Sequence, residues 1–254
     1  MTRAEIIAEF DNSVEGDLNE IDCIECNKCL NRGYITIPID DVHTNIVDCE
    51  CKKKRDTYIS LRNCGITMNE LNRFTFDNFN IEKKWHKTLV DYCKEYLQEL
   101  SNGNDYWFIL SGQSGSGKTH LCTAIFQEAI KTKSCRGLYM MWNTEIPNLC
   151  NLRRSFNDEE YREQIKIYKD VSILYIDDLF KLDGRLKEDS LSIAYEILNY
   201  RYLKNKITII STETTKDQFK LLDIAISGRC AEKCGKYWFD IKGENTNYRF
   251  KGEL

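Results

Sequence analysis

The stretch GQSGSGKT at residues 112–119 constrains the fold most, because it follows the apolar run WFIL and precedes a helical pattern. YWFIL at 106–110 predicts a short buried strand, and apolar residues at helical spacing predict a helix over 118–131. In this setting the glycines let backbone N–H groups approach phosphates, Lys118 reaches the β- and γ-phosphates, and Thr119 ligates Mg²⁺. A glycine-rich turn before an ordinary helix is the alternative, but the complete spacing favours ATP binding. The predicted binding residues are Gly112, Ser114, Gly115, Ser116, Gly117, Lys118 and Thr119.

Two adjacent carboxylates, Asp177 and Asp178, lie near the end of the apolar stretch VSILYIDDL at 171–179. A strand that ends in this way is typical of the metal-binding element of ATPases with a phosphate loop. Asp177 is then the Mg²⁺ ligand, and Asp178 stands where a base polarises the attacking water. A solvated turn would explain the pair if it stood alone. With GQSGSGKT in the same chain, the pair predicts a catalytic site of Lys118, Asp177 and Asp178.

The remaining apolar runs predict three further strands, at 137–142, 206–214 and 236–241. Strands that alternate with helices indicate an α/β fold, with a parallel sheet covered by helices on both faces and its ligand at the carboxyl ends of the strands. The chain has no N-K-x-D motif for reading guanine and no arginine-rich lid segment of the kind found in nucleotide kinases. These features favour an ATPase that does mechanical or switching work.

Two close cysteine pairs, C-x-x-C and C-x-C, flank a β-like stretch near the N-terminus. Each pair can clamp one side of a tetrahedral Zn²⁺ site, and a hairpin between the pairs would close it. Free buried thiols are the alternative interpretation. The predicted zinc ligands are Cys26, Cys29, Cys49 and Cys51, with Cys23, His43 and Cys64 as possible substitutes.

Charge is distributed unevenly along the chain. Residues 1–70 hold 8 Lys/Arg against 14 Asp/Glu, and the remainder holds 28 against 26. Phosphate repels an acidic surface, so this first part is suited to docking on a basic protein rather than on nucleic acid. The beginning has no signal-peptide pattern, and no window approaches the ~20 apolar residues of a membrane span. We therefore expect a cytoplasmic protein with reduced thiols and no membrane partner.

Several of these motifs together resemble the DnaC/DnaI family of bacterial and phage replicative helicase loaders, which are AAA+ ATPases related to the IstB transposition helpers. The motifs are GQSGSGKT, ILYIDDL, the strand end ISTET, AISGRC at 225–230 and the ending FDIKGENTNYR. The resemblance implies ATP-dependent loading of a DnaB-type ring helicase onto single-stranded DNA in DNA replication. It implies an N-terminal cysteine-rich zinc module at 1–70 that grips the helicase, and an AAA+ ATPase domain at 71–254. Arg229 matches the family's arginine finger, which acts in a neighbouring subunit, so self-association through Arg229 is implied.

Three departures from the broader AAA+ pattern qualify the resemblance. Asp178 is one methylene shorter than the usual glutamate, which predicts slow hydrolysis. Ser211, Thr212 and Glu213 stand where an asparagine commonly ends the sensor strand, so the sensing residue stays open. Only 13 residues follow the last predicted strand, too few for a full C-terminal helical lid, although Arg249 is a candidate for reaching the site.

A long insert at 143–170 separates two of the predicted strands. Asn157, with Glu160 three residues later, indicates a capped second helix, so we expect two helices here. In the loaders such an insert contacts single-stranded DNA, and charge mixed with aromatic rings suits that contact. A solvated helix face is the alternative. The candidate DNA residues are Arg153, Arg154, Phe156 and Tyr161.

Two other functions stay open at this point. The chain could be a zinc-containing adaptor that uses ATP as an assembly switch with little turnover, which the short Asp178 and the missing lid favour. It could also be an IstB-like transposition helper that prefers duplex DNA, although the cysteine module is expected of loaders more than of those helpers.

Overall fold

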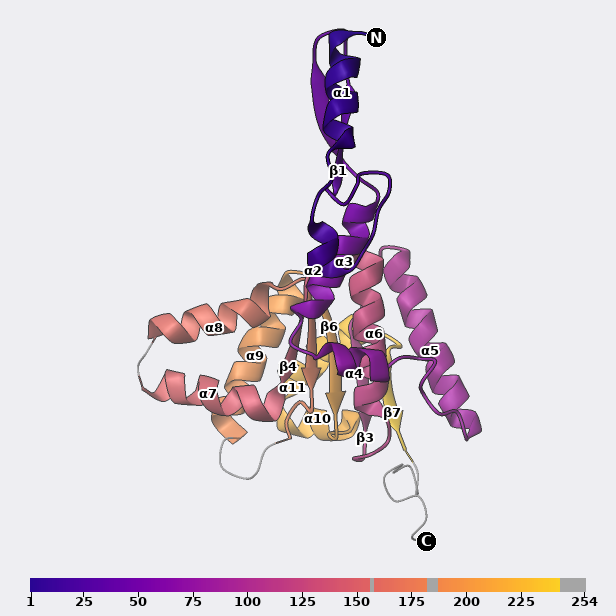
Figure 1. The fold of residues 1–254 in the computed structure, drawn as a ribbon. Coiled ribbons are helices and arrows are strands. Elements are labelled where there is room, and N and C mark those ends of the chain that lie inside the picture. Colours follow the sequence, from indigo (N-terminus) through magenta and orange to yellow (C-terminus); the bar gives the residue numbers. More distant parts are fainter. Residues whose placement is uncertain (156–157, 182–186, 243–254) are drawn as a thin grey trace. The chain divides into compact units, whose positions relative to one another are not determined.

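The computed structural model describes residues 1–155, 158–181 and 187–242, and it divides the chain into two compact units. The units are Met1–Ser60 and Leu61–Leu254 (Figure 1). The sequence-based boundary at residue 70 lies ten residues further along. The difference arises because Leu61, Cys64 and Ile66 belong to the hydrophobic core of the second unit.

The first unit is built on an antiparallel hairpin of β1 (Tyr34–Pro38) and β2 (Thr44–Asp48), which lies between the two cysteine pairs as predicted. Helix α1 (Arg3–Ser13) begins with a capping box in which Thr2 and Glu5 bond each other's backbone N–H groups. Its small residues Ala4 and Ala8 are buried, and α1 packs mainly against β1. The other helices are α2 (Leu18–Asp22) and α3 (Cys51–Arg62), whose last two residues belong to the second unit.

The second unit contains a five-stranded sheet in which every pairing is parallel. The strand order is β4-β5-β6-β3-β7, so β6 lies between the phosphate-loop strand β3 and the carboxylate strand β5. This arrangement confirms the predicted α/β class. The strands are β3 (Phe108–Gly112), β4 (Gly137–Met141), β5 (Ile173–Asp177), β6 (Ile207–Thr212) and β7 (Trp238–Ile241).

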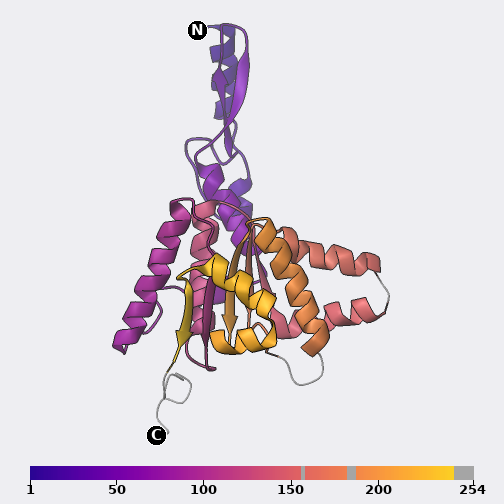
Figure 2. The same cartoon turned by 180° about the vertical axis from the view of Figure 1, so that it is seen from behind.

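Helices cover both faces of the sheet because successive side chains of each strand point to opposite sides (Figures 1 and 2). In β5, Ile173 and Tyr175 pack into a core with α5 and α6, while Leu174 and Ile176 pack into a second core with helices of the other face. The strands are apolar on both sides for this reason. The helices are α4 (Met68–Arg73), α5 (Lys84–Ser101), α6 (Lys118–Lys133), α7 (Trp142–Arg154), α8 (Asp158–Asp170), α9 (Lys187–Leu203), α10 (Lys216–Leu222) and α11 (Ile224–Cys234).

The predicted elements differ from the observed ones mainly at their ends. Strand β3 begins two residues later than predicted and continues to Gly112, and Trp142 is the first residue of α7 rather than the end of β4. The insert forms the two predicted helices, α7 and α8. Its proposed cap Asn157, and Arg249 near the C-terminus, lie outside the described residues.

Candidate nucleotide site and cysteine cluster

The loop between β3 and α6 has the backbone shape of a phosphate cradle. Gly115 and Gly117 have φ values of 76° and 86°, which glycine adopts readily and residues with a Cβ adopt at a cost. Gly112, with φ 151°, lies so close to β7 that an added Cβ would approach Ile241 Cβ to 2.9 Å. The Ser116 hydroxyl is buried and has no hydrogen-bond partner among the described residues. An unsatisfied polar atom in a loop of this shape fits a bound anion.

Lys118 is the first residue of α6 and lies almost fully buried under this loop, with 5% exposure. Its ammonium group donates a hydrogen bond to the backbone oxygen of Gln113 at 2.9 Å. Burial lowers the pKa of Lys118, and the charges of Glu213 and Asp178 oppose that shift. A buried cation at the N-terminus of a helix is suited to receiving an anionic ligand.

Asp177 ends β5, where its carboxylate is surrounded by hydroxyl donors. Thr119 Oγ1 donates to Asp177 Oδ1 at 3.1 Å, Tyr175 donates to the same oxygen at 2.8 Å, and Tyr139 donates to Oδ2 at 3.0 Å. Ser211 also donates to Oδ1. Burial and the neighbouring Asp177 charge raise the pKa values of Tyr139 and Tyr175, so both phenols stay protonated as donors.

The Thr119–Asp177 pair was predicted from two motifs 58 residues apart, and the fold brings it within hydrogen-bond distance. A threonine hydroxyl and a carboxylate are the hard oxygen ligands that Mg²⁺ accepts beside nucleotide phosphates. The three other donors to Asp177, from Tyr139, Tyr175 and Ser211, were not predicted. They fix the orientation of the carboxylate.

Asp178 follows with a positive φ of 56°, a turn that directs its carboxylate away from the strand and into the cleft. Its N–H group donates to Ser211 Oγ at 3.0 Å, so one hydroxyl on β6 contacts both carboxylate residues. Lys181 donates to Asp178 Oδ2 at 3.1 Å and to Glu213 Oε1 at 2.8 Å. Partial burial alone would raise the pKa of Glu213, but the hydrogen bond and charge of Lys181 lower it.

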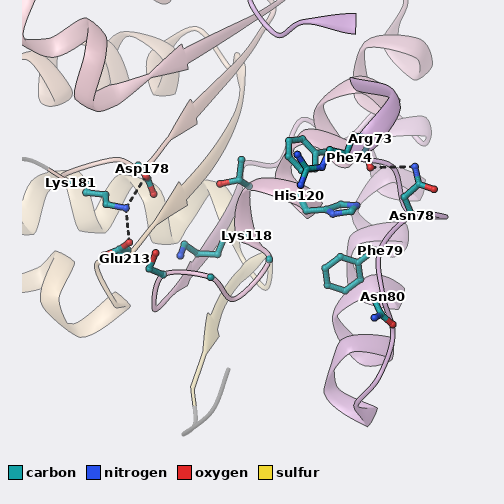
Figure 3. A pocket seen from close by; sticks show the side chains of 14 residues that line it. Arg73, Phe74, Asn78, Phe79, Asn80, Lys118, His120, Asp178, Lys181 and Glu213 are labelled. Carbon is teal, nitrogen blue, oxygen red and sulfur yellow. Dashed lines mark hydrogen bonds and ion pairs between the residues drawn. The ribbon is translucent and has the colours of Figure 1, made fainter. Parts of the chain in front are cut away.

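A cleft of about 400 Å³ has the charged residues Asp178, Lys181 and Glu213 at one end and passes the phosphate loop (Figure 3). Its other end is a wall of aromatic and polar residues that the sequence analysis did not predict. In the wall, His120 lies against the rings of Phe74 and Phe79, with ring centroids 5.2 Å apart in both cases. Its Nε2 bonds the backbone oxygen of Thr75 at 2.7 Å. Burial lowers the pKa of His120, which favours the neutral ring. The wall residues are Arg73, Phe74, Asn78, Phe79, Asn80 and His120.

The signal for this wall was present in the sequence as FTFDNFN at 74–80, which the sequence motifs did not connect with the nucleotide site. Two of its three aromatic rings, those of Phe74 and Phe79, lie against His120, the α6 residue that directly follows Thr119. The rings are tilted to one another, at 57° and 80° to the His120 ring, and aromatic rings beside a phosphate loop are suited to contact with a nucleobase.

Arg229 lies on α11 and is not among the residues that line this cleft. Its guanidinium group donates to Ala225 O at 3.0 Å and to the Tyr195 hydroxyl at 3.3 Å. The same group lies over the rings of Tyr195 and Tyr202, 5.2 and 5.7 Å from their centroids. Its Nε has no hydrogen-bond partner in the described part of the chain.

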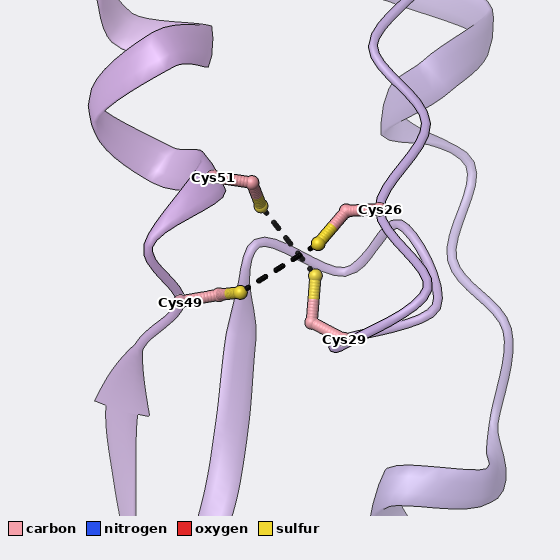
Figure 4. A group of neighbouring side chains, drawn as sticks. All are labelled: Cys26, Cys29, Cys49 and Cys51. Atoms are coloured by element: carbon pink, nitrogen blue, oxygen red, sulfur yellow. Dashed lines mark hydrogen bonds between the residues drawn. The ribbon is translucent and has the colours of Figure 1, made fainter.

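The four predicted zinc ligands converge in the first unit (Figure 4). All four sulfurs lie within 4.8 Å of one another, with 3.8 Å between Cys26 and Cys49 and 3.5 Å between Cys29 and Cys51. In a tetrahedral Zn²⁺ site with Zn–S bonds of about 2.3 Å, the sulfurs are about 3.8 Å apart. The four thiols therefore fit a metal ion of this geometry.

The substitute ligands lie elsewhere. Cys23 is exposed and outside the group of four sulfurs, and Cys64 is buried in the core of the second unit. His43 is exposed, with its Nδ1 2.7 Å from Asp40 Oδ2. The backbone N–H of Cys29 lowers the pKa of Cys26 to about 7, which favours the thiolate form that metals bind.

A buried ion pair supports the cysteine cluster. Arg55 donates to both carboxylate oxygens of Asp22, at 2.5 and 2.7 Å, and each of these residues is only 3% exposed. Arg55 Nε also donates to Cys51 Sγ at 3.5 Å, and Nη2 donates to Ile24 O at 2.7 Å. One guanidinium group thus links α3, the end of α2 and a predicted metal ligand.

The candidate DNA residues are less available than expected. Tyr161 is buried, and its hydroxyl donates to Glu196 at 2.8 Å, so it offers no open ring face for base stacking. Arg153 and Arg154 are exposed but donate to Ser192 and Asp189 on α9. Phe156 lies outside the described residues.

Comparison with known proteins decides the family. Residues 71–232, well over half of the chain, match the bacterial DnaA ATPase domain. The chain belongs to this family. In this DnaA-type AAA+ ATPase, the phosphate loop at 112–119 and the two carboxylates at 177–178 lie within the matched residues.

Two relatives of this DnaA-type ATPase match most of the chain, and a third matches less than half of it. The phage-like element PBSX protein XkdC of Bacillus subtilis is 30% identical over 256 aligned positions, covering 95% of this chain and 91% of XkdC. The B. subtilis protein YqaM is 31% identical over 205 positions, covering 77% of this chain and 63% of YqaM. The replicative helicase loader DnaC of Buchnera aphidicola is 31% identical over 108 positions, which is 41% of this chain and 42% of that protein.

Solved structures share the fold of this DnaA-type ATPase. A putative primosome component from Streptococcus pyogenes superposes with a TM-score of 0.55 at 16% identity, covering 73% of this chain and 95% of that one. The DnaC helicase loader superposes with a TM-score of 0.52 at 18% identity, covering 68% and 98%. The resemblance to DnaC/DnaI-type AAA+ loaders is therefore confirmed.

Among the described helices of this chain, none is both long and apolar enough to cross a membrane.

Proposed function

We propose that this ATPase loads a DnaB-type replicative ring helicase onto single-stranded DNA, with ATP binding ordering the loader and hydrolysis permitting release. The observation that carries the proposal is the Thr119–Asp177 pair beside the phosphate loop, in a chain similar to a replicative helicase loader. The geometry supports the nucleotide part of this function, and the first unit supports the partner part.

ATP would lie along the cleft, with its base against the Phe74–Phe79 wall and its phosphates at the loop. The backbone of residues 112–117 and the Lys118 ammonium group would bind the phosphates, since both offer donors at the N-terminus of α6. Thr119 and Asp177 would hold Mg²⁺, which neutralises phosphate charge when it is bound. The buried Ser116 hydroxyl would gain a partner in this complex.

Hydrolysis would use Asp178 to orient water. The water oxygen bonds to the γ-phosphorus, the bond from that phosphorus to the β–γ bridging oxygen breaks, and a water proton passes to Asp178. The products are ADP and inorganic phosphate. We expect slow turnover, because the aspartate side chain is short and its carboxylate must first be released from the pair with Lys181. An adaptor that uses ATP chiefly as an assembly ligand is the second candidate, and the same ion pair favours it.

The first unit would dock on the helicase, and two observations support this role. Residues 1–60 carry 7 Lys/Arg against 13 Asp/Glu, so the surface complements a basic partner. On α1 the small residues Ala4 and Ala8 are buried, while Ile6 and Phe10 are 55% and 70% exposed. A helix that buries alanine and exposes larger apolar residues one turn apart is suited to insertion into an apolar groove. Zn²⁺ at the four cysteines would hold this unit in shape.

Arg229 would act in the nucleotide site of an adjacent subunit. It does not line the cleft of its own chain, and its Nε is unsatisfied among the described residues. An arginine supplied across a subunit boundary stabilises the charge that develops during phosphoryl transfer. Self-association would therefore be needed for efficient turnover.

A loading assay tests the proposed function. Circular single-stranded DNA without free ends would be incubated with the ring helicase of the same organism, this protein and ATP–Mg²⁺, and helicase retained on the circles would be counted. We expect retention with the wild type and none with Lys118→Ala. The control Lys131→Ala alters an exposed lysine that pairs with Glu128 on the same helix, and it should load normally. Equal retention with and without the protein would reject the proposal.

A further inference from the structure

Lys181 forms the charged end of the cleft, opposite the aromatic wall. Its ammonium group bridges the carboxylates of Asp178 and Glu213, at 3.1 and 2.8 Å. In Figure 3 these three residues lie together on one side of the phosphate loop, and Phe74, Phe79 and His120 lie on the other side. A nucleotide whose base stacks on the wall would direct its last phosphate toward Lys181.

The charges around this end explain why a lysine is needed there. Without Lys181, the carboxylates of Asp178 and Glu213 would face an incoming polyphosphate and repel it. Lys118 is held under the loop by the backbone oxygen of Gln113, and Arg73 lies over the Phe74 ring in the wall. Among the described cleft residues, Lys181 is thus the cation that directly pairs with these two carboxylates.

The side chain of Lys181 is also able to change partners. It is 43% exposed, and Asp178 and Glu213 are 25% and 37% exposed, so the two ion pairs are only partly shielded from solvent. An ammonium group has three donors on a flexible four-carbon chain, which lets it bond a phosphate oxygen and Glu213 together. Moving from Asp178 to phosphate would leave the Asp178 carboxylate available to a water molecule.

We propose that Lys181 contacts the terminal phosphate of bound ATP and, when no terminal phosphate is present, occupies Asp178 as an ion pair. The inference rests on the proposed nucleotide site and adds a residue that distinguishes ATP from ADP. It gives Glu213, which directly follows β6, the role of holding Lys181 in both states. The chemical step stays as described above, and Lys181 serves only to bind phosphate and to uncover Asp178.

The affinities of the full-length chain for ADP and for a non-hydrolysable ATP analogue, measured by calorimetry with Mg²⁺, test this proposal. Lys181→Gln should weaken analogue binding by about ten- to a hundredfold, because a charge-assisted hydrogen bond is lost, and leave ADP binding within about threefold. Lys181→Arg should keep most of the preference for the analogue. Lys220→Gln removes an exposed lysine that pairs with Asp217 on α10 and should change neither affinity.

The outcomes separate this inference from the function on which it rests. If Lys181→Gln weakens ADP and the analogue equally, or weakens neither, the contact with the terminal phosphate is contradicted while the nucleotide site stands. If the wild type binds neither ligand, the nucleotide site and the Lys181 contact are both rejected. Turnover provides a second readout: Lys181→Gln should need more ATP for half-maximal turnover, because ATP binding is weaker, while the rate at saturating ATP should stay within about threefold of the wild type.

Discussion

The two units of this chain bury different kinds of residue. In the ATPase unit, Trp107, Trp142 and Tyr175 are fully buried within two continuous apolar cores. In residues 1–60, all of which are described, the buried apolar residues are only Ala4, Ala8 and three cysteines. No aromatic or branched aliphatic side chain is buried there. The ATPase unit can therefore be stabilised by apolar burial, whereas the first unit requires another source of stability.

The two units also differ in where they place their larger apolar residues. Ile6, Phe10, Ile39 and Ile46 of the first unit are all more than half exposed. A unit held by the Asp22–Arg55 pair and by the proposed metal at the cysteine cluster would not need these side chains in its core, which would leave them available for a partner. The ATPase unit instead gathers polar groups around Asp177. The following experiments test this division, beginning with the largest expected effect.

Loss of the metal should unfold the first unit alone. Cys49→Ala removes one of four ligands, and structural Zn²⁺ in small modules contributes about 10 kcal/mol or more to folding. We expect loss of bound zinc and full hydrogen exchange across residues 1–60, with protection of the ATPase strands unchanged. Cys23→Ala, which alters an exposed cysteine outside the cluster, should retain one zinc per chain. Full zinc content in Cys49→Ala would contradict the assignment.

Loss of the buried cation should remove nucleotide binding without unfolding either unit. Lys118→Ala deletes the ammonium group under the loop, and its contacts with two phosphates should be worth about a hundredfold or more in affinity. Calorimetric titration with ATP–Mg²⁺ measures the effect, and circular dichroism checks the fold. An unchanged ATP affinity would remove the basis of the nucleotide site.

Polar replacement of the exposed α1 residues should affect binding and not stability. In Ile6→Ser/Phe10→Ser, both altered side chains are more than half exposed, so the free energy of unfolding should change by less than about 1 kcal/mol. Affinity for the helicase should fall about thirtyfold or more if these residues are anchors. Leu203→Ser, at a 66% exposed position of the ATPase unit, is the matched control. Fluorescence anisotropy measures these affinities. If the double variant bound the helicase as tightly as the wild type, the docking surface would lie elsewhere.

The smallest expected effect concerns β6, the strand that lies between the phosphate-loop strand β3 and the carboxylate strand β5. Ser211→Ala removes the hydroxyl that contacts Asp177 and the Asp178 N–H, which should cost about 1–2 kcal/mol of stability and slow ATP turnover. Thr212→Ala removes the neighbouring hydroxyl, which donates to Leu179 O at 2.7 Å. It should cost similar stability in urea unfolding and leave turnover nearly unchanged. If Thr212→Ala slowed ATP turnover and Ser211→Ala did not, Thr212 would be the sensing residue instead.

Much of the fold could be predicted because its strands carry strong local signals. Runs such as VSILYIDDL are apolar on both faces, as strands of a buried parallel sheet must be, and the loop glycines fix the strand–loop–helix order. The four cysteines were predicted for a similar reason, since their spacing already brings each pair together. The strands, the phosphate loop and the cysteine pairs could be predicted because each depends on residues that are close together in the sequence.

The rest depends on the order of strands, which no local pattern reveals. Because β6 lies between β3 and β5, Ser211 reaches Asp177, and Glu213 meets Lys181 from a segment 32 residues away. The wall at 74–80 joins the site through packing on α6. Tyr161 was wrongly expected to offer a ring for stacking, because its burial against α9 is a tertiary contact.

Native mass spectrometry of the full-length protein mixed with the ring helicase of the same organism tests the loader function most directly. Spectra would be recorded with ATP–Mg²⁺, with ADP and without nucleotide, for the wild type and for Lys118→Ala. We predict a complex with several copies of this chain per helicase ring in ATP–Mg²⁺, and a less complete assembly with ADP or with Lys118→Ala. Absence of any complex in all nucleotide states would contradict the account.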